Sequence, residues 1–118
     1  MTPVIYKLAD RAEWEQARVA GVYEGSAVDH ADGYIHMSTA DQLTETARRH
    51  YAGRAGLVLA AIDAKALGGA LQWEASRGGD LFPHLYGSLP LTAVTVERAL
   101  SVSDDGVMVF EDGAAGWS

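Results

Sequence analysis

The sequence predicts an α+β domain, a small split β-sandwich of antiparallel or mixed strands with two main helices. Short β-rich runs alternate with two amphipathic segments, and each of these segments begins with a helix-capping signal, at residues 10–13 and 39–42. Near the carboxyl end, residues 94–102 and 107–110 flank the turn sequence DDG, which predicts a hairpin. Because a hairpin requires antiparallel pairing, a doubly wound parallel sheet is disfavoured.

Length and composition favour a single domain over residues 1–118. A chain of 118 residues that is 48% hydrophobic can bury one core. The net charge of -7 argues against nucleic acid as a partner, unless Lys7, Arg48, Arg49 and Arg77 converge in a basic cleft. There is no cysteine, and no stretch approaches the roughly 20 apolar residues of a membrane span. We therefore expect a cytoplasmic protein that makes no membrane contact and has no disulfide.

The first half of the chain is predicted to begin with a strand and a helix. Residues 4–8 are β-rich, and Asp10 with Glu13 provides an acidic capping signal for a helix that Gly21 ends. Residues 23–31 lack periodicity and carry Gly, Ser, Asp and His. This composition predicts a loop, of a length that often serves a functional site.

The stretch 32–39, DGYIHMST, joins a turn, a strand and a helix start. Its alternation predicts a strand over residues 34–38, in which His36 and Ser38 share one face with the tyrosine that precedes them. That polar face either meets solvent or lines a pocket. The capping box that follows predicts a helix over residues 40–51.

The second half is predicted to be mostly β. Residues 57–62 form an almost unbroken apolar run, which predicts a central strand buried on both faces. A short strand over residues 71–74 follows. Residues 81–87, LFPHLYG, mix bulky apolar side chains with Pro and Gly, which predicts an edge strand or a pocket wall. The ordered core should span about residues 3–111, with a loose tail over residues 112–118.

Two histidines are the candidate site residues that the pattern itself indicates. A histidine can act as a general base, hydrogen-bond a ribose hydroxyl or bind a metal, and His36 has the Ser38 hydroxyl on its face, whereas His84 has apolar neighbours. The alternative for each is a buried histidine paired with a backbone carbonyl. Glu74 and Tyr51 are explained most simply as an exposed carboxylate and a core-capping ring. No metal-ligand spacing, phosphate loop or nucleophile elbow occurs, so no metal is expected.

Three strings carry a family resemblance: DGYIHMST at residues 32–39, WE at 73–74 and FPHLYG at 82–87. In this order they resemble the domain-of-unknown-function 952 family of small bacterial proteins, over about residues 4–102. That family is similar to the ADP-ribosyltransferase superfamily, with the NAD-dependent RNA 2′-phosphotransferases as the nearest group.

The superfamily resemblance has two counterparts in this sequence and one departure. The phosphotransferase strand Val-His-Leu-Ser is similar to residues 35–38, IHMS, and a buried strand ending in Ile-Asp is similar to residues 59–63, LAAID. On the first strand the family usually has Tyr-His-Ile, whereas this chain has YKL at residues 6–8. Lys7 thus replaces the histidine expected to hold the nicotinamide ribose.

The resemblance implies a cleft between two small sheets that binds NAD or ADP-ribose as a nucleotide-like ligand. Catalytic roles would fall to His36, to His84 as base, and to Glu74 as the anion that stabilises a cationic sugar. The implied cofactor-binding side chains are Lys7, Ser38, Tyr51 and Tyr86. Two functions stay open: an NAD-dependent transferase, and a catalytically inactive domain of the same fold that binds a ligand or a protein.

Overall fold

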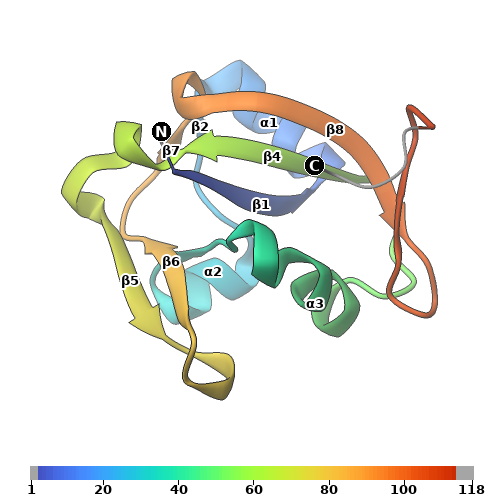
Figure 1. Cartoon of the computed structure of the whole chain (residues 1–118). Coiled ribbons are helices and arrows are strands. Elements are labelled where there is room, and N and C mark those ends of the chain that lie inside the picture. Colours follow the sequence, from blue (N-terminus) through green and yellow to red (C-terminus); the bar gives the residue numbers. More distant parts are fainter. Residues whose placement is uncertain (1–2, 114–118) are drawn as a thin grey trace.

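A computed structural model describes residues 3–113, apart from the side chain of Arg77 (Figure 1). The helices are α1 (Arg11–Ala20), α2 (Ala27–Asp32) and α3 (Ala40–His50), with 3₁₀ turns η1 (Ala64–Ala70), η2 (Arg77–Gly79) and η3 (Leu91–Ala93). The strands are β1 (Val4–Asp10), β2 (Val22–Tyr23), β3 (Ile35–His36), β4 (Leu57–Asp63), β5 (Leu71–Ala75), β6 (Leu81–Leu85), β7 (Leu89–Pro90), β8 (Val94–Val102) and β9 (Met108–Phe110). No helix in the described part of the chain is long and apolar enough to cross a membrane.

The strands form a four-stranded sheet in the order β1-β4-β8-β9, a three-stranded sheet β3-β6-β5 and a two-stranded sheet β2-β7. Every pairing between the described strands is antiparallel, so the predicted α+β class with antiparallel sheets is confirmed. A bridge joins the two larger sheets, because the backbone N–H groups of Tyr6 and Ser38 each donate to the other residue's carbonyl, at 2.8 and 2.9 Å. This bridge brings β1 beside the segment that follows β3.

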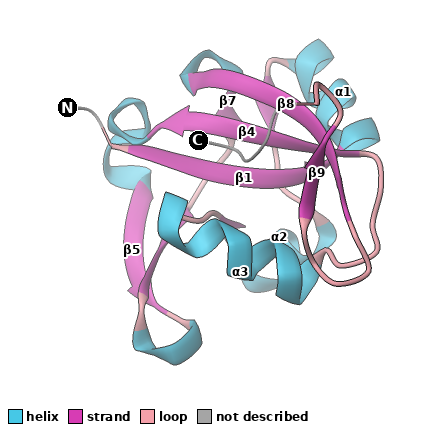
Figure 2. Cartoon of the chain, turned by 45° about the vertical axis from the view of Figure 1, so that its right-hand side comes forward, coloured by secondary structure: helices cyan, strands magenta, loops and turns pink. Residues whose placement is uncertain are grey.

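The predicted central strand is confirmed, since β4 lies between β1 and β8 and alternates between two apolar clusters. Val58 and Ile62 pack with Trp14 of α1 on one face, and Leu59 packs with Leu43 of α3 on the other. In Figures 1 and 2, α3 lies below β1 while the β8–β9 hairpin closes the far edge of the sheet. The four-stranded sheet is therefore covered by a helix on each face.

Both predicted helix starts are confirmed by their caps. The Asp10 carboxylate accepts from the Glu13 N–H at 3.2 Å, and Gly21 ends α1 with a left-handed φ of 84°. The Thr39 N–H donates to the Gln42 side chain at 3.0 Å at the start of α3. Local sequence signals thus determined where these two helices begin.

The predicted loop over residues 23–31 is wrong. It contains the end of β2 and most of α2, whose N-cap is Ser26. The Ser26 hydroxyl accepts from the Asp29 N–H at 3.2 Å, and the Asp29 carboxylate accepts from the Ser26 N–H at 2.9 Å. This reciprocal capping box nucleates a helix too short to show an apolar period.

Residues 81–87 were predicted to form an edge strand or a pocket wall. The edge strand is wrong, because β6 is the middle strand of its sheet, whereas Phe82 and His84 of this segment do line a cavity. Pro83 is tolerated there because β3 pairs with β6 only through Ile35 and His36, opposite Leu85 and His84. At the end of this short ladder Pro83 only has to accept, from the Met37 N–H at 3.1 Å. The strand predicted over residues 34–38 accordingly shortens to two residues.

The predicted tail is described only at its start. Asp112 pairs with Arg98, and the residue before the tail, Glu111, pairs with Arg11. The rest of the predicted tail, residues 114–118, lies outside the described residues.

Candidate functional site

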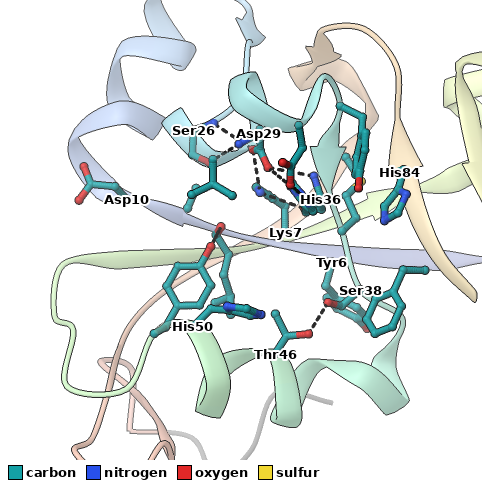
Figure 3. A pocket seen from close by; sticks show the side chains of 18 of the residues that line it. Tyr6, Lys7, Asp10, Ser26, Asp29, His36, Ser38, Thr46, His50 and His84 are labelled. Atoms are coloured by element: carbon teal, nitrogen blue, oxygen red, sulfur yellow. Dashed lines mark hydrogen bonds and ion pairs between the residues drawn. The ribbon is translucent and has the colours of Figure 1, made fainter. Parts of the chain in front are cut away.

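A cavity of about 570 Å³ lies beside the Tyr6–Ser38 bridge, with walls from β1, α2, β3, β6 and α3 (Figure 3). Its volume falls within the range of small-molecule sites, roughly 300–1,000 Å³. The sequence-predicted residues that line it are Lys7, His36, Ser38, Tyr51 and His84. Glu74 and Tyr86 do not line it, and their position is described below with that of His84.

A buried ion pair forms the floor of the cavity. The Lys7 ammonium donates to Asp29 Oδ2 at 3.0 Å and to the His36 carbonyl at 2.9 Å, and the two side chains are only 4% and 2% exposed. Burial alone would raise the Asp29 pKa, but hydrogen bonds from His36 and the charge of Lys7 outweigh it and hold that pKa below its ordinary value. The charge of Lys7 is therefore balanced within the protein.

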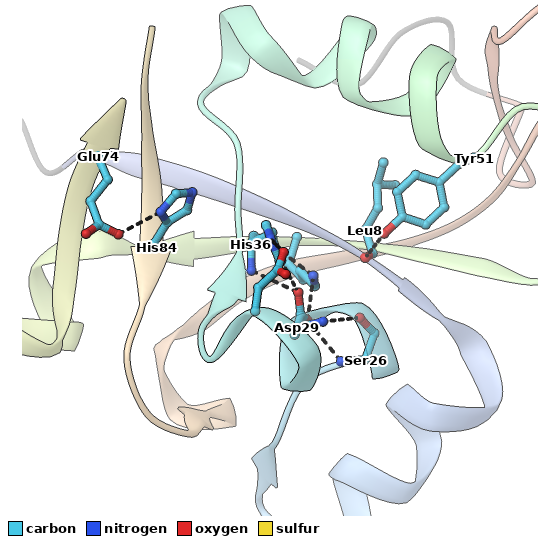
Figure 4. A network of polar contacts seen from close by, with 9 residues as sticks. Leu8, Ser26, Asp29, His36, Tyr51, Glu74 and His84 are labelled. Carbon is cyan, nitrogen blue, oxygen red and sulfur yellow. Dashed lines mark hydrogen bonds and ion pairs between the residues drawn. The ribbon is translucent and has the colours of Figure 1, made fainter. Parts of the chain in front are cut away.

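Asp29 is the residue at the centre of the site that sequence reasoning missed. Besides Lys7, it accepts from the backbone N–H groups of Ser26 and His36, at 2.9 and 3.0 Å (Figure 4). The Ser-x-x-Asp spacing at residues 26–29 was the available signal for its helix. Its pairing with a lysine 22 residues earlier had no local signal.

His36 has a carboxylate at each ring nitrogen. Nδ1 lies 2.5 Å from Asp29 Oδ1, and Nε2 lies 2.8 Å from Asp32 Oδ2. Both ring nitrogens of His36 are therefore occupied by carboxylate contacts, which leaves no free ring nitrogen to act as a base.

One ring nitrogen of His84 contacts a residue outside the cavity, Glu74. Its Nδ1 lies 2.8 Å from Glu74 Oε1, and the Tyr86 hydroxyl donates to the same oxygen at 2.7 Å. These hydrogen bonds, from Tyr86 and then from His84, lower the Glu74 pKa. The other ring nitrogen points away from Glu74 (Figure 4), and the side chain, 5% exposed, lines the cavity.

Aromatic rings fix this histidine in place. The Tyr34 ring stacks on His84 with centroids 4.0 Å apart, and it also contacts His36 at 4.6 Å and Tyr86 at 5.3 Å. The two histidines proposed from the sequence are therefore neighbours, with ring centroids 5.8 Å apart. Such a rigid ring cluster can orient a ligand without loss of side-chain entropy.

Ser38 and Tyr51 line the cavity with their hydroxyl groups already paired. Ser38 Oγ lies 2.9 Å from Thr46 Oγ1, and the Tyr51 hydroxyl donates to the Leu8 carbonyl at 3.1 Å. Burial raises the pKa of Tyr51 to about 12, so it remains a donor. The Arg54 guanidinium lies 5.1 Å from the centre of the Tyr51 ring and also lines the cavity.

The basic cleft considered for nucleic acid is not assembled by the described side chains. Arg48 and Arg49 both pair with Glu45 on the exposed face of α3, and Lys7 is paired in the interior. The side chain of Arg77 lies outside the described part of the structure. Among the described residues, no three His, Cys, Asp or Glu side chains are grouped so that they could hold a metal ion.

Residues 8–97 match the model of a family described as "Protein of unknown function (DUF952)". The chain belongs to this family. The chain is similar to protein CC0527 from Caulobacter crescentus, whose crystal structure superposes with a TM-score of 0.85 and whose sequence is 52% identical. The match covers 90% of this chain and 93% of the CC0527 chain. The solution NMR structure of the same protein is 51% identical, with a TM-score of 0.79, over 95% and 97% of the two chains. No curated protein matches the chain. The fold described above is thus that of a DUF952 protein.

Proposed function

We propose that the cavity binds a nucleotide-like small molecule, with NAD or ADP-ribose as the ligand class. The observation that carries this proposal is the pair of adjacent histidines, each held by a carboxylate, at the wall of a cavity of about 570 Å³. Such a site combines an apolar, aromatic wall with a few fixed donors and acceptors, as small-molecule sites do. The resemblance of the family to the ADP-ribosyltransferases points to the same ligand class.

The lining residues fit such a ligand, but the basic residue that would contact it differs from Lys7, the one expected from the sequence. Because Lys7 is paired with Asp29, it is a poor partner for a pyrophosphate. Arg54 lines the cavity and has no carboxylate partner among the described residues, so it is the better candidate for that contact. Ser38 Oγ, whose one contact with Thr46 leaves further hydrogen-bonding capacity, would contact a ribose hydroxyl. The His36 ring would pack against that ribose, and the Tyr51 ring would support a planar ring.

A transferase activity is the second candidate, and the Glu74–His84 contact favours it. A carboxylate at Nδ1 keeps the proton on that nitrogen, so that Nε2 is free to accept one from an acceptor hydroxyl in the cavity. Bound NAD supplies an ADP-ribosyl group with nicotinamide as the leaving group. Here Glu74 acts as a positioning residue, behind the histidine, and does not reach the cavity itself.

Calorimetric titration with NAD, ADP-ribose and nicotinamide tests the binding proposal. A ligand that binds only the folded state stabilises it, by about 2.7 kcal/mol at a hundredfold excess over its dissociation constant. We expect saturable binding that His36→Ala and Arg54→Ala weaken. His30→Ala is the matched control, since His30 is exposed on α2 and does not line the cavity. Absence of binding by all three ligands at millimolar concentration would refute the proposal.

Nicotinamide release separates a transferase from an inactive binding domain. If the protein turns NAD over, His84→Asn should abolish release while NAD still binds. Binding without release, in the wild-type protein and with a range of hydroxyl acceptors, would support the inactive binding domain.

A further inference from the structure

Strand β5 (Leu71–Ala75) has one edge that no other described strand covers. The order β3-β6-β5 places it at the end of its sheet, and in Figures 1 and 2 it lies at the margin of the molecule. The outer edge of β1 differs, because the bridge between Tyr6 and Ser38 occupies it. An uncovered edge is a template for pairing with another strand, so its occupant needs to be identified.

The hydrogen bonds at the two ends of the β5–β6 ladder show which backbone groups face this edge. The Tyr86 N–H donates to the Ala70 carbonyl at 2.8 Å, and the Ser76 N–H donates to the Asp80 carbonyl at 2.9 Å. Because bonded pairs alternate along an antiparallel ladder, residues 72 and 74 are the ones that bond to β6. The backbone groups of residues 71, 73 and 75 therefore point away from β6.

Most of these outward groups are unused. The Leu71 N–H donates to the Gly68 carbonyl, whereas the N–H and C=O groups of Trp73 and Ala75 have no hydrogen-bond partner among the described residues. The Trp73 side chain adds apolar surface, since it is 43% exposed. The strand also lacks the usual protection of an edge, because it contains no Lys or Pro and its register with β6 has no bulge.

A second copy of the chain has the complementary backbone groups. A two-fold axis beside Trp73 would place every outward residue opposite an outward residue of the other copy, in antiparallel register. The Trp73 N–H of each copy then donates to the Trp73 carbonyl of the other, and the Ala75 N–H donates to the Leu71 carbonyl. This register pairs both N–H donors that are free on the edge.

The side chains are complementary in the same register. Glu74 is the only charged residue of β5, and it would lie opposite Gln72 of the second copy instead of another carboxylate. The two Trp73 rings would lie on the opposite face of the sheet from Glu74, where each covers exposed surface of the other. Specific capture of an unrelated extended peptide relies on pockets beside the edge, and residues 71–75 line neither the cavity described above nor a smaller one at the start of α3.

We propose that two copies of the chain form a dimer by antiparallel pairing of their β5 strands, which joins their three-stranded sheets into one continuous sheet. The interface is short, with five strand residues from each copy. The dimer is therefore transient, with a dissociation constant of about 10 µM to 1 mM. The edge lies outside the cavity, so this inference does not depend on the proposed function.

Opposite charges at Trp73 test the register by sedimentation equilibrium, in about 0.15 M salt to screen the net negative charge of the copies. Trp73→Glu and Trp73→Lys each place like charges opposite one another, so each alone should stay monomeric up to about 1 mM. An equimolar mixture places opposite charges across the axis and should associate more than either variant alone. Val109→Glu is the matched control, because Val109 is a similarly exposed residue of the end strand β9, and it should dimerise like the wild-type protein.

Ala75→Pro tests the backbone pairing. It removes an outward N–H, whereas the ladder with β6 needs no donor from this residue. We expect the dissociation constant of the dimer to rise about tenfold or more, because each dimer loses two hydrogen bonds, with little change in the urea midpoint. Amide exchange in the wild-type protein should slow with rising concentration at Trp73 and Ala75, and not at Val109.

Three results would overturn the inference. A wild-type protein that stays monomeric at about 1 mM excludes the dimer and leaves the edge to an extended segment of another protein. Association that Val109→Glu abolishes, or that persists in both Trp73 variants alone, assigns the contact to another surface. A mixture of the two Trp73 variants that associates no more than its components excludes the register centred on this residue.

Discussion

The Lys7 ammonium and the Asp29 carboxylate lie 3.0 Å apart at the floor of the cavity, and both are almost fully buried. The pair ties β1 to α2, and through the His36 carbonyl it also ties β1 to β3. Removing two charges from water is unfavourable, so such a pair is stabilising only when its remaining hydrogen bonds are made. Here Asp29 also accepts from both Ser26 and His36, which completes the network that shapes the cavity wall.

Asp29→Asn should destabilise the protein strongly, because it leaves the Lys7 charge buried without a counter-charge. Breaking one side of a buried pair typically costs about 3–5 kcal/mol, measured as the free energy of unfolding in urea. Lys7→Met combined with Asp29→Asn should recover part of the loss. The control is Glu45→Gln, which removes the exposed pairs with Arg48 and Arg49 and should leave stability almost unchanged. An Asp29→Asn protein as stable as the control would show that the pair is not a structural element.

The protein should become less stable in acid because the Asp29 carboxylate becomes protonated. The pKa of Asp29 is lower in the folded protein than its ordinary value, so the unfolded chain binds the proton more readily. The stabilisation is therefore complete above about pH 4, the unfolded value, and is lost progressively as the pH falls below it. Urea unfolding at a series of pH values should show a slope below about pH 4 that is smaller in Asp29→Asn. Equal slopes in the two proteins would assign the acid sensitivity to other carboxylates.

The turn between β8 and β9 should tolerate no side chain at Gly106. A Cβ there would lie 2.5 Å from Arg48 Cγ and 2.8 Å from Arg48 Cα, and the residue has a φ of 86°. Gly21 has a similar φ of 84° but nothing within 4 Å of its Cβ position. Both alanine variants should lose about 1–2 kcal/mol from the left-handed backbone, and Gly106→Ala should lose more because α3 must move. Equal losses in urea unfolding would mean that the turn can shift away from α3 freely.

The elements that were predictable from sequence are those whose signals are local. The caps at Asp10 and Thr39 define α1 and α3, and the apolar run of β4 defines the centre of the sheet. The prediction for the region around Ser26 was wrong because a helix of six residues is too short to display a helical period, although its capping box is present in the sequence. The assignment of β6 as an edge strand was wrong because it relied on the preference of Pro83 for edge strands. That preference does not reveal that β3, the neighbouring strand, pairs through only two residues and ends before Pro83 would have to donate a hydrogen bond.

The candidate site was only partly predictable for the same reason. His36 and His84 follow from short motifs, and the structure brings them together at the cavity. Asp29 could not be found in this way, because its importance depends on burial and on Lys7, a partner distant in sequence. A charge or hydroxyl acquires its energetic weight only when tertiary packing removes it from water.

The Glu74 carboxylate should determine the tautomer of His84. In the neutral ring one nitrogen carries the proton, and a carboxylate 2.8 Å from Nδ1 selects the Nδ1–H form. Long-range ¹H–¹⁵N correlation spectra of the wild-type protein should then show an unprotonated Nε2. Glu74→Ala should shift the ring toward a tautomer mixture, whereas Glu74→Gln should preserve the Nδ1–H form, since its amide oxygen also accepts. Tyr86→Phe is the control, because it removes the other donor to Glu74 and leaves the His84 contact in place. An Nε2–H tautomer in the wild-type protein would exclude His84 as the proton acceptor in the cavity, because the nitrogen that points away from Glu74 would already carry a proton.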